Sequence, residues 1–359
     1  MLKNNILIVD KYLSLLINEI NYPVGGATVQ SFNWIKGFTN NGLNPIIISE
    51  VKVENNSNYT ILITKKYNSI LKPILLSIYY YKLTIRFKPK FVYVSIPWWS
   101  NIYLFLACRI NGIKIIQRIS NDIFVDERLN NVITGLIKKT LFKVNYKLTD
   151  VFVCQNSYQE SRLKKYNNSS KIVKYYNPFE QKKLERNRNR SYIAWVGIFQ
   201  KQKNLSELLS IAKKLPMYKF KIAGQKLKSI DEETSSILNL LEKLNNVEFV
   251  GMINRNQIFN FLANAYCLLN TSHYEGFSNT YLESFSVHTP VVTRNITDPD
   301  NIIKEFNLGI SVKNYSAIPN AIINIIEDKY EFNNFSKYLD KYHDPVNISK
   351  KLILDIEQL

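Results

Sequence analysis

The chain has 359 residues, and its 47 Lys/Arg against 29 Asp/Glu give a formal net charge of +18. With 46% hydrophobic residues, 11 Gly and 11 Pro, the composition is globular and excludes a disordered or collagen-like chain. No apolar run approaches the roughly 18–20 residues that span a bilayer. A chain of this length predicts two domains. Three scattered cysteines without metal-ligand spacing, Cys108, Cys154 and Cys267, indicate reduced thiols and a cytoplasmic protein.

Short apolar runs alternate with helical segments along the chain, which predicts parallel sheets covered by helices. In the first half the predicted strands are 5–10, 45–49, 91–96, 114–119 and 151–155. In the second half they are 192–197, 220–224, 247–251, 266–271 and 290–293, and predicted helices include 204–215 and 231–244. We therefore expect an α/β fold of two doubly wound, Rossmann-like domains that face each other across a cleft.

A polar and charged stretch without apolar periodicity, residues 177–190, is typical of a connector between domains. It predicts an acceptor-side domain over 1–185 and a donor-binding domain over 186–334. We expect the C-terminal segment 335–359 to pack back on the first domain as a helix.

The positive charge is concentrated in the first domain. Residues 1–185 hold 26 basic and 11 acidic residues, a net charge of +15, whereas residues 186–359 hold 21 and 18, a net charge of +3. Two segments, 63–90 and 132–147, interleave Lys and Arg with Ile, Leu, Phe and Tyr and contain no acidic residue. Such helices suit an anionic membrane surface. Ordinary solvated helices and a Lys-rich coding bias are the alternatives, and nucleic-acid binding is disfavoured because Arg is scarce.

The stretch 270–293 contains the most informative motif. A buried strand ends near Thr271, a loop carries Glu275, and a helix starts near residues 278–280. Glu283 lies one turn inside that helix, so both glutamates can face the edge where the strands end. The first amides of the helix form an anion site suited to a phosphate. The alternative for Glu283 is a capping box with Thr280, which needs no ligand.

This motif resembles the hallmark of the retaining glycosyltransferases of family 4, which have the GT-B fold. The family pattern Ser-x-x-Glu-Gly-Phe, then Glu, then Pro-Val-Val matches Ser272–Phe277, Glu283 and Pro290–Val292. Further pieces follow in the order of the family: Gly25-Gly26, Asn177-Pro178, Val196-Gly197, Lys203-Asn204, Ala223-Gly224 and Phe249-Val250-Gly251. The stretch Thr297–Asn301 is similar to a subgroup that builds bacterial surface polysaccharides.

The resemblance implies a role for each matching residue. Glu275 would bind hydroxyls of the donor sugar, Glu283 would hold the ribose hydroxyls of the nucleotide, and Lys203 would neutralise the diphosphate leaving group. Glu275 and Lys203 are therefore the expected catalytic residues. The expected donor-binding set continues with Gly25, Gly26, Gly197, Val250, Gly251, Met252, Gly276, Phe277, Ser278, Asn279 and Thr280.

Three positions depart from the family pattern. Ile198 stands where the family has an Arg after Val-Gly, the usual histidine of the first domain is absent, and His288 occupies a position that is commonly Gly, which we interpret as local loop variation. In the matching region, Arg118, Asn121 or Asp122 would take over the contact with the donor sugar.

The resemblance thus implies transfer of a sugar from a nucleotide-diphosphate sugar to an acceptor hydroxyl. The acceptor would be a saccharide or a lipid-linked saccharide in polysaccharide biosynthesis. No cofactor or metal is expected, because lysine and helix-terminal amides can stabilise the leaving group. The expected location is cytoplasmic, peripheral at the inner face of the plasma membrane. A GT-B nucleotide-sugar epimerase, a basic nucleic-acid-binding protein and an inactive relative remain as alternatives.

Overall fold

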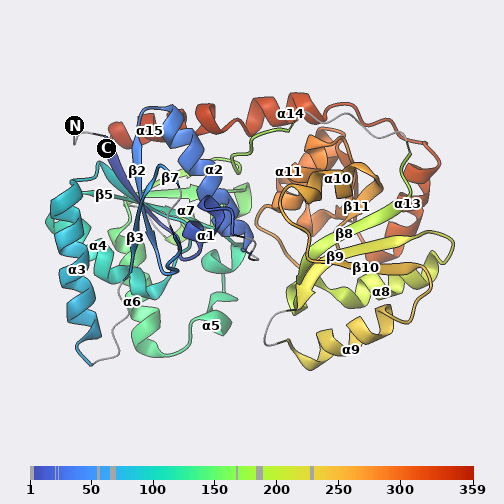
Figure 1. Cartoon of the computed structure of the whole chain (residues 1–359), viewed down its shortest axis with the longest axis horizontal. Coiled ribbons are helices and arrows are strands. Elements are labelled where there is room, and N and C mark those ends of the chain that lie inside the picture. Colours follow the sequence, from blue (N-terminus) through green and yellow to red (C-terminus); the bar gives the residue numbers. More distant parts are fainter. Residues whose placement is uncertain are drawn as a thin grey trace. The chain divides into compact units, whose positions relative to one another are not determined.

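The computed structural model describes residues 4–20, 22, 24–54, 57–64, 70–166, 169–182, 189–226 and 230–359. Lys65 and Lys66 of the predicted basic segment, and residues 183–188 of the predicted connector, lie outside these ranges. The chain forms two compact units, and Figure 1 labels their elements. Unit 1 comprises Met1–Glu180 and His343–Leu359, and unit 2 comprises Gln181–Tyr342.

Unit 1 is built on a seven-stranded parallel sheet with the order β3-β2-β1-β4-β5-β6-β7. Its strands are β1 (Asn5–Val9), β2 (Asn44–Ser49), β3 (Thr60–Ile63), β4 (Phe91–Val94), β5 (Lys114–Arg118), β6 (Val151–Cys154) and β7 (Lys171–Lys174). The central strands are apolar on both sides, because helices cover both faces of the sheet.

Helices pack on each face of this sheet. The helices of unit 1 are α1 (Leu13–Ile17), α2 (Gly26–Asn40), α3 (Lys72–Phe87), α4 (Ile102–Ile110), α5 (Leu129–Val132), α6 (Leu136–Leu148), α7 (Ser157–Tyr166) and α15 (Pro345–Glu357), with 3-10 turns η1 (Trp99–Asn101) and η2 (Asp122–Val125). Side chains of α1, α2 and α15 share one core with the sheet. Those of α3 and α4 form a core on the opposite face, and Phe142 of α6 packs with Phe152 and Cys154 in a third cluster.

Helix α15 belongs to unit 1 although it follows unit 2 in the sequence. It lies against α2 (Figure 1). Its Ile348, Leu352 and Ile356 join the core cluster that includes α2 side chains. The Asp344 carboxylate caps its start by accepting a hydrogen bond from the Asn347 amide at 2.7 Å. The preceding helix, α14 (Phe335–Tyr342), packs in unit 2 instead. Only part of the segment 335–359 therefore returns to unit 1.

Unit 2 is built on a six-stranded parallel sheet with the order β10-β9-β8-β11-β12-β13. The strands are β8 (Tyr192–Phe199), β9 (Phe220–Lys226), β10 (Val247–Gly251), β11 (Ala265–Leu269), β12 (Val291–Arg294) and β13 (Gly309–Val312). The helices are α8 (Leu205–Lys214), α9 (Glu232–Leu241), α10 (Gln257–Ala263), α11 (Asn279–Ser286), α12 (Ile302–Glu305), α13 (Ile318–Ile326) and α14, with 3-10 turns η3 (Lys201–Lys203), η4 (Asn295–Thr297), η5 (Pro299–Asn301) and η6 (Tyr315–Ala317).

All ten predicted strands are present, and the α/β fold with two doubly wound sheets is confirmed. The structure adds β3, β7 and β13, which lie at sheet edges and are only half-buried. Among the residues that the structure describes, no helix is both long enough and apolar enough to cross a membrane.

The contact between α2 and α15 depends on the absence of a side chain at Gly37. A Cβ atom there would lie 2.2 Å from the Pro345 carbonyl oxygen and 2.5 Å from the Ser349 Oγ. We therefore expect Gly37→Ala to lower the free energy of unfolding of unit 1 by about 1–3 kcal/mol, as other overpacking substitutions do. Thr39→Ala, on the exposed side of the same helix, is the control and should change little. Urea unfolding measures both; equal stability of the two variants would contradict this close contact.

Candidate active site

Two loops meet at the edge of the unit 2 sheet where the strands end. Strands β8 and β11 are parallel neighbours, so the turn η3 after β8 lies beside the loop after β11. Hydrogen bonds to backbone carbonyls join the two loops. The Thr271 hydroxyl donates to the Lys203 carbonyl at 2.8 Å, the His273 amide donates to the Gln202 carbonyl at 2.9 Å, and the Gln202 side chain donates to the Tyr274 carbonyl at 2.9 Å. These hydrogen bonds fix the position of the Lys203 backbone, from which its side chain extends.

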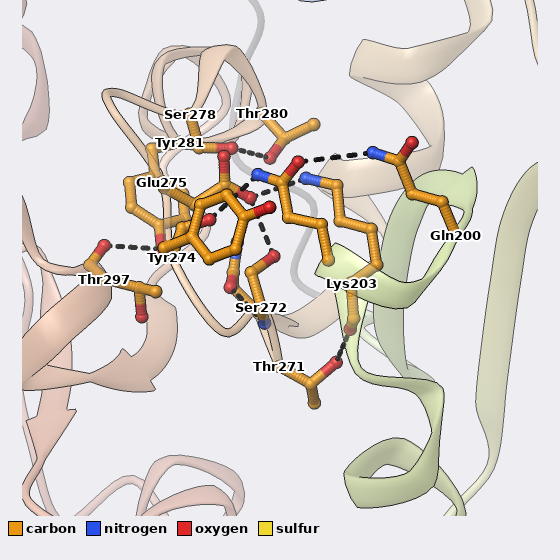
Figure 2. A network of polar contacts seen from close by, with 12 residues as sticks. Gln200, Lys203, Thr271, Ser272, Tyr274, Glu275, Ser278, Thr280, Tyr281 and Thr297 are labelled. Carbon is orange, nitrogen blue, oxygen red and sulfur yellow. Dashed lines mark hydrogen bonds and ion pairs between the residues drawn. The ribbon is translucent and has the colours of Figure 1, made fainter. Parts of the chain in front are cut away.

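Lys203 and Glu275, which the sequence motif selects separately, contact each other directly (Figure 2). The Lys203 Nζ lies 2.5 Å from the Glu275 Oε1, and the Ser272 hydroxyl donates to the same oxygen at 2.7 Å. Only 17% of the lysine and 10% of the glutamate side chain are exposed. The pair therefore places a cation, a carboxylate and a hydroxyl together in a partly desolvated position, where electrostatic interactions are stronger than in water.

Tyr315 of η6 supports both loops, and the sequence analysis did not find it. Its hydroxyl donates to the Thr271 carbonyl at 2.8 Å and accepts a hydrogen bond from the Asn204 side chain at 2.9 Å. The Arg294 guanidinium lies 4.0 Å from the centre of the Tyr315 ring. No motif marks Tyr315, but Arg294 ends β12 and could have been found as a cation at a strand end.

Helix α11 starts beside the ion-paired loop. Its N-cap is Ser278, whose hydroxyl lies 2.8 Å from the Thr280 hydroxyl, and the preceding Gly276 and Phe277 are buried. Further along the helix, the Tyr281 and Thr293 hydroxyls lie 3.1 Å apart, within hydrogen-bonding distance. Because Asn279 and Thr280 lie in the first turn of the helix, Thr280 is not its N-cap. The predicted alternative of a capping box between Thr280 and Glu283 is therefore wrong.

Glu283 lies one turn inside α11 and is half-buried. No hydrogen bond or ion pair joins its carboxylate to any residue that the structure describes. Burial raises the pKa of this carboxyl from 4.5 to about 7, and the charge of Arg255 opposes the shift. A carboxyl group with a shifted pKa at the ligand-binding edge of a sheet is a candidate functional group. It is available to accept hydrogen bonds from a ligand.

The predicted glycines of unit 2 have different surroundings. A Cβ atom at Gly197 would lie 3.0 Å from the Trp195 ring, and Trp195 donates to the Thr271 hydroxyl at 3.1 Å. Gly197 therefore makes room for a side chain that supports the ion-paired loop. Gly251 ends β10 with a φ of +73°, which favours glycine. The residues beside it, Val250 and Met252, are half-buried and exposed respectively.

In unit 1 the pair Gly25 and Gly26 begins α2 at the edge where β1 ends. Gly25 is the N-cap, and a Cβ atom there would meet nothing within 4 Å, so its backbone faces open space. The buried Asp10 after β1 holds this helix start, because its carboxylate accepts hydrogen bonds from Thr28 at 2.9 Å and Ser31 at 2.8 Å. Sequence reasoning did not select Asp10, although an acid after a buried strand is a recognisable signal.

The residues expected to replace the missing histidine are engaged inside unit 1. The buried Arg118 donates to the Gln155 side chain at 2.7 Å and to the Asn177 side chain at 2.8 Å. Asn121 caps η2, and Asp122 accepts a hydrogen bond from Gln159 at 2.8 Å. Burial raises the pKa of the Asp122 carboxyl. These side chains stabilise the loop after β5 and the Asn177 segment.

Solved structures with little sequence identity share the fold over nearly the whole chain. Sucrose-phosphate synthase of Thermosynechococcus elongatus has a TM-score of 0.80 at 14% identity, with 99% of each chain covered. HepE of Anabaena in complex with UDP and glucose has a TM-score of 0.77 at 13% identity, with 99% of this chain and 100% of that chain covered. Two parallel-sheet units of this kind define the GT-B fold of glycosyltransferases.

The family match falls on the part of the chain that contains the ion pair. Residues 177–342 match the family model of the glycosyl transferases group 1. An uncharacterized glycosyltransferase of Methanocaldococcus jannaschii is 27% identical over 226 residues, which are 55% of this chain and 54% of that protein. The alignment thus spans about half the length of this curated relative. The chain has the GT-B fold, and the stretch that matches the group 1 model lies almost entirely in unit 2.

The raised pKa of Glu283 has a consequence for stability. Between pH 4.5 and about pH 7, Glu283 is ionised in the unfolded chain but protonated in the folded one. The free energy of unfolding therefore falls as pH rises through this range. Glu283→Gln removes this effect. We expect it to raise the free energy of unfolding by about 1–3 kcal/mol at about pH 8 and to change it little at about pH 5.

Urea unfolding at the two pH values measures this difference, with Glu232→Gln on the exposed side of α9 as the control. A Glu283→Gln effect that does not grow with pH would show that the carboxyl is ionised in the ordinary range.

Proposed function

We propose that the protein transfers a sugar from a nucleotide-diphosphate sugar to an acceptor hydroxyl. The observation that carries this proposal is the contact between Lys203 and Glu275 beside the start of α11. A lysine and a helix N-terminus suit a diphosphate, and carboxylates suit sugar hydroxyls. The GT-B fold and the match to the group 1 model support the same reaction.

In the proposed reaction the bond between the anomeric carbon and the diphosphate oxygen breaks, and a bond to the acceptor oxygen forms. The acceptor hydroxyl gives up its proton, and the nucleoside diphosphate leaves with the electron pair of the broken bond. Negative charge develops on the diphosphate, so Lys203 and the amides of Phe277–Thr280 would stabilise the transition state more than the ground state. The proposal requires no metal ion or cofactor.

The remaining residues would bind and orient the donor. Glu275 would accept hydrogen bonds from sugar hydroxyls, and ionised Glu283 would accept those of the ribose. The backbone around Val250–Met252 would border the base, and Gly25 and Gly26 would allow close approach of the donor to unit 1. HepE in complex with UDP and glucose supports a nucleotide sugar as the donor class.

We further propose membership in family 4, with retention of the anomeric configuration, and a role in bacterial surface-polysaccharide synthesis. The support is the glutamate motif at Ser272–Phe277 and Glu283 together with the stretch Thr297–Asn301. The acceptor would be a lipid-linked saccharide at the inner face of the plasma membrane. The excess of positive charge in the first 185 residues supports an acceptor on an anionic surface.

The proposal predicts that Lys203→Ala and Glu283→Ala abolish transfer from the donor while the protein remains folded. Removing a cation from a developing charge should lower kcat by about 100-fold or more. The matched control is Lys201→Ala, because Lys201 is 76% exposed and pairs with Glu233 at 3.3 Å. Its kcat should stay within about twofold of the unchanged protein, as for most exposed side chains.

The measurement is release of nucleoside diphosphate from a panel of nucleotide sugars, with and without saccharide acceptors, after thermal unfolding has shown that each variant is folded. Unchanged turnover in Lys203→Ala or Glu283→Ala would contradict the assignment of the site. Turnover of the sugar nucleotide that never depends on an acceptor would favour the epimerase alternative.

A further inference from the structure

Helix α3 carries an apolar stripe on the side that faces away from the protein. Five apolar residues recur at intervals of three and four, and each exposes 40–58% of its surface: Leu71, Ile74, Ile78, Tyr81 and Ile85. The opposite side of the helix already packs on the sheet through Leu76 and Leu83. A surface helix normally has a polar outer face. Helix α3 is apolar on its outer face as well as on the face that packs on the sheet, and packing within unit 1 does not require the outer one.

The exposed apolar surface continues on the neighbouring helices. Helix α4 packs against both α3 and α6 on the same face of the sheet. It exposes Leu106 by 45% and Ile110 by 71%, and the start of α6 exposes Leu136 by 82% and Ile137 by 76%. We call these residues of α4 and α6 together with the α3 stripe the α3–α6 face. Exposed apolar side chains gathered on three neighbouring helices are typical of an interaction site.

Exposed cations flank this apolar surface. On and after α3 they are Lys72, Lys82, Arg86 and Lys88, and on α6 they are Lys138, Lys143 and Lys147. Neither helix contains an acidic residue. Among the described residues, none of these seven cations is within ion-pair distance of a carboxylate, so their charge is not neutralised within the chain.

We propose that the α3–α6 face is a docking surface for an anionic lipid membrane. The apolar stripe would enter the boundary between headgroups and acyl chains, and the flanking cations would lie at the level of the phosphates. A second copy of the chain would bring two sets of unpaired cations together, so charge complementarity favours the lipid surface. This inference rests on the proposed function, because a lipid-linked acceptor is presented by such a surface.

The topology of unit 1 gives this docking a consequence. Each of α3, α4 and α6 leads into the next parallel strand, so the helices run opposite to the strands and begin at the edge where strands end. Leu71, Ile74, Leu136 and Ile137 therefore lie toward the same edge as Gly25. Docking would bring the proposed acceptor side of unit 1 close to the lipid headgroups.

The first test is sedimentation of the full chain with vesicles of phosphatidylcholine alone, or with about one-third phosphatidylglycerol. We expect at least about tenfold stronger binding to the anionic vesicles, and weaker binding at about 0.5 M salt than at about 0.1 M, because salt screens the cations. Equal binding to both vesicles, or no binding to either, would overturn the proposal.

The second test distinguishes binding through the α3 stripe from non-specific hydrophobic binding by other exposed apolar residues. The double variant Ile78→Ser/Ile85→Ser removes two side chains that are 45% and 46% exposed, and Leu240→Ser/Leu354→Ser removes two that are 45% and 50% exposed elsewhere. The first pair should lower anionic-vesicle binding about tenfold and the second should leave it within about twofold, since insertion depends on buried apolar area. Equal effects of the two pairs would overturn the assignment to α3.

The third test concerns the cations. Lys82→Gln/Arg86→Gln should weaken binding to anionic vesicles, whereas Lys213→Gln/Lys214→Gln at the exposed end of α8 should not. Size-exclusion chromatography with light scattering checks the second-copy alternative. A dimer that Ile78→Ser/Ile85→Ser dissociates would assign the face to self-association and overturn the lipid proposal.

Turnover with a short water-soluble acceptor distinguishes this inference from the proposed function. The stripe variants should keep that turnover while they lose vesicle binding. If the unchanged protein turns over the donor but does not bind vesicles, the docking proposal is overturned and the proposed function is not. Intact vesicle binding without turnover of any nucleotide sugar would instead contradict the proposed function.

Discussion

The ion pair of Lys203 and Glu275 depends on the hydrogen bonds that hold η3 against the loop after β11. Burying a lysine and a glutamate costs desolvation energy that their attraction only partly offsets, so such a pair does not assemble a site by itself. The backbone of both loops is instead fixed by strand pairing, by Thr271 and by the Tyr315 hydroxyl. The two charges are brought together by the fold, which is the arrangement that preorganised electrostatic stabilisation requires.

The fold also determines the position of Glu283, but here the carboxylate has no hydrogen-bond or ion-pair partner among the described residues, and its ionised form lowers stability. Its carboxylate has neither the lysine nor the hydroxyl that Glu275 has, and burial raises its pKa to about 7. Burial makes the ionised form of this carboxyl unfavourable in the free protein. Hydrogen bonds donated by ligand hydroxyls would therefore stabilise the carboxylate strongly. Stability given up at such a position is typical of binding sites. The contrast between the two glutamates comes from their surroundings, since eight positions of sequence separate identical side chains.

The sequence was sufficient for the strands with continuous apolar runs, because a buried parallel strand is apolar on both faces. It missed β3, β7 and β13, which lie at sheet edges and have only four residues each, half-buried except for the exposed Thr60, so any apolar run in them is short. It found Lys203, Glu275 and the start of α11 because they lie within motifs. It missed Tyr315, which comes 40 residues after Glu275 in a short turn and acts through a single hydroxyl. A contact of that kind depends on tertiary structure alone.

A coding bias toward Lys and Ile can account for the net charge of +18, but it does not account for where these residues lie on α3. A bias toward Lys and Ile raises both residues throughout the chain but does not order them around a helix. On α9 the outward positions are mainly polar, with Glu232, Glu233 and Asn239 beside the single Leu240. On α3 the outward positions are apolar at intervals of three and four, and the cations lie beside them. Composition explains the abundance of these residues but not their position on α3, and the proposed anionic lipid surface would account for both the apolar stripe and the cations beside it.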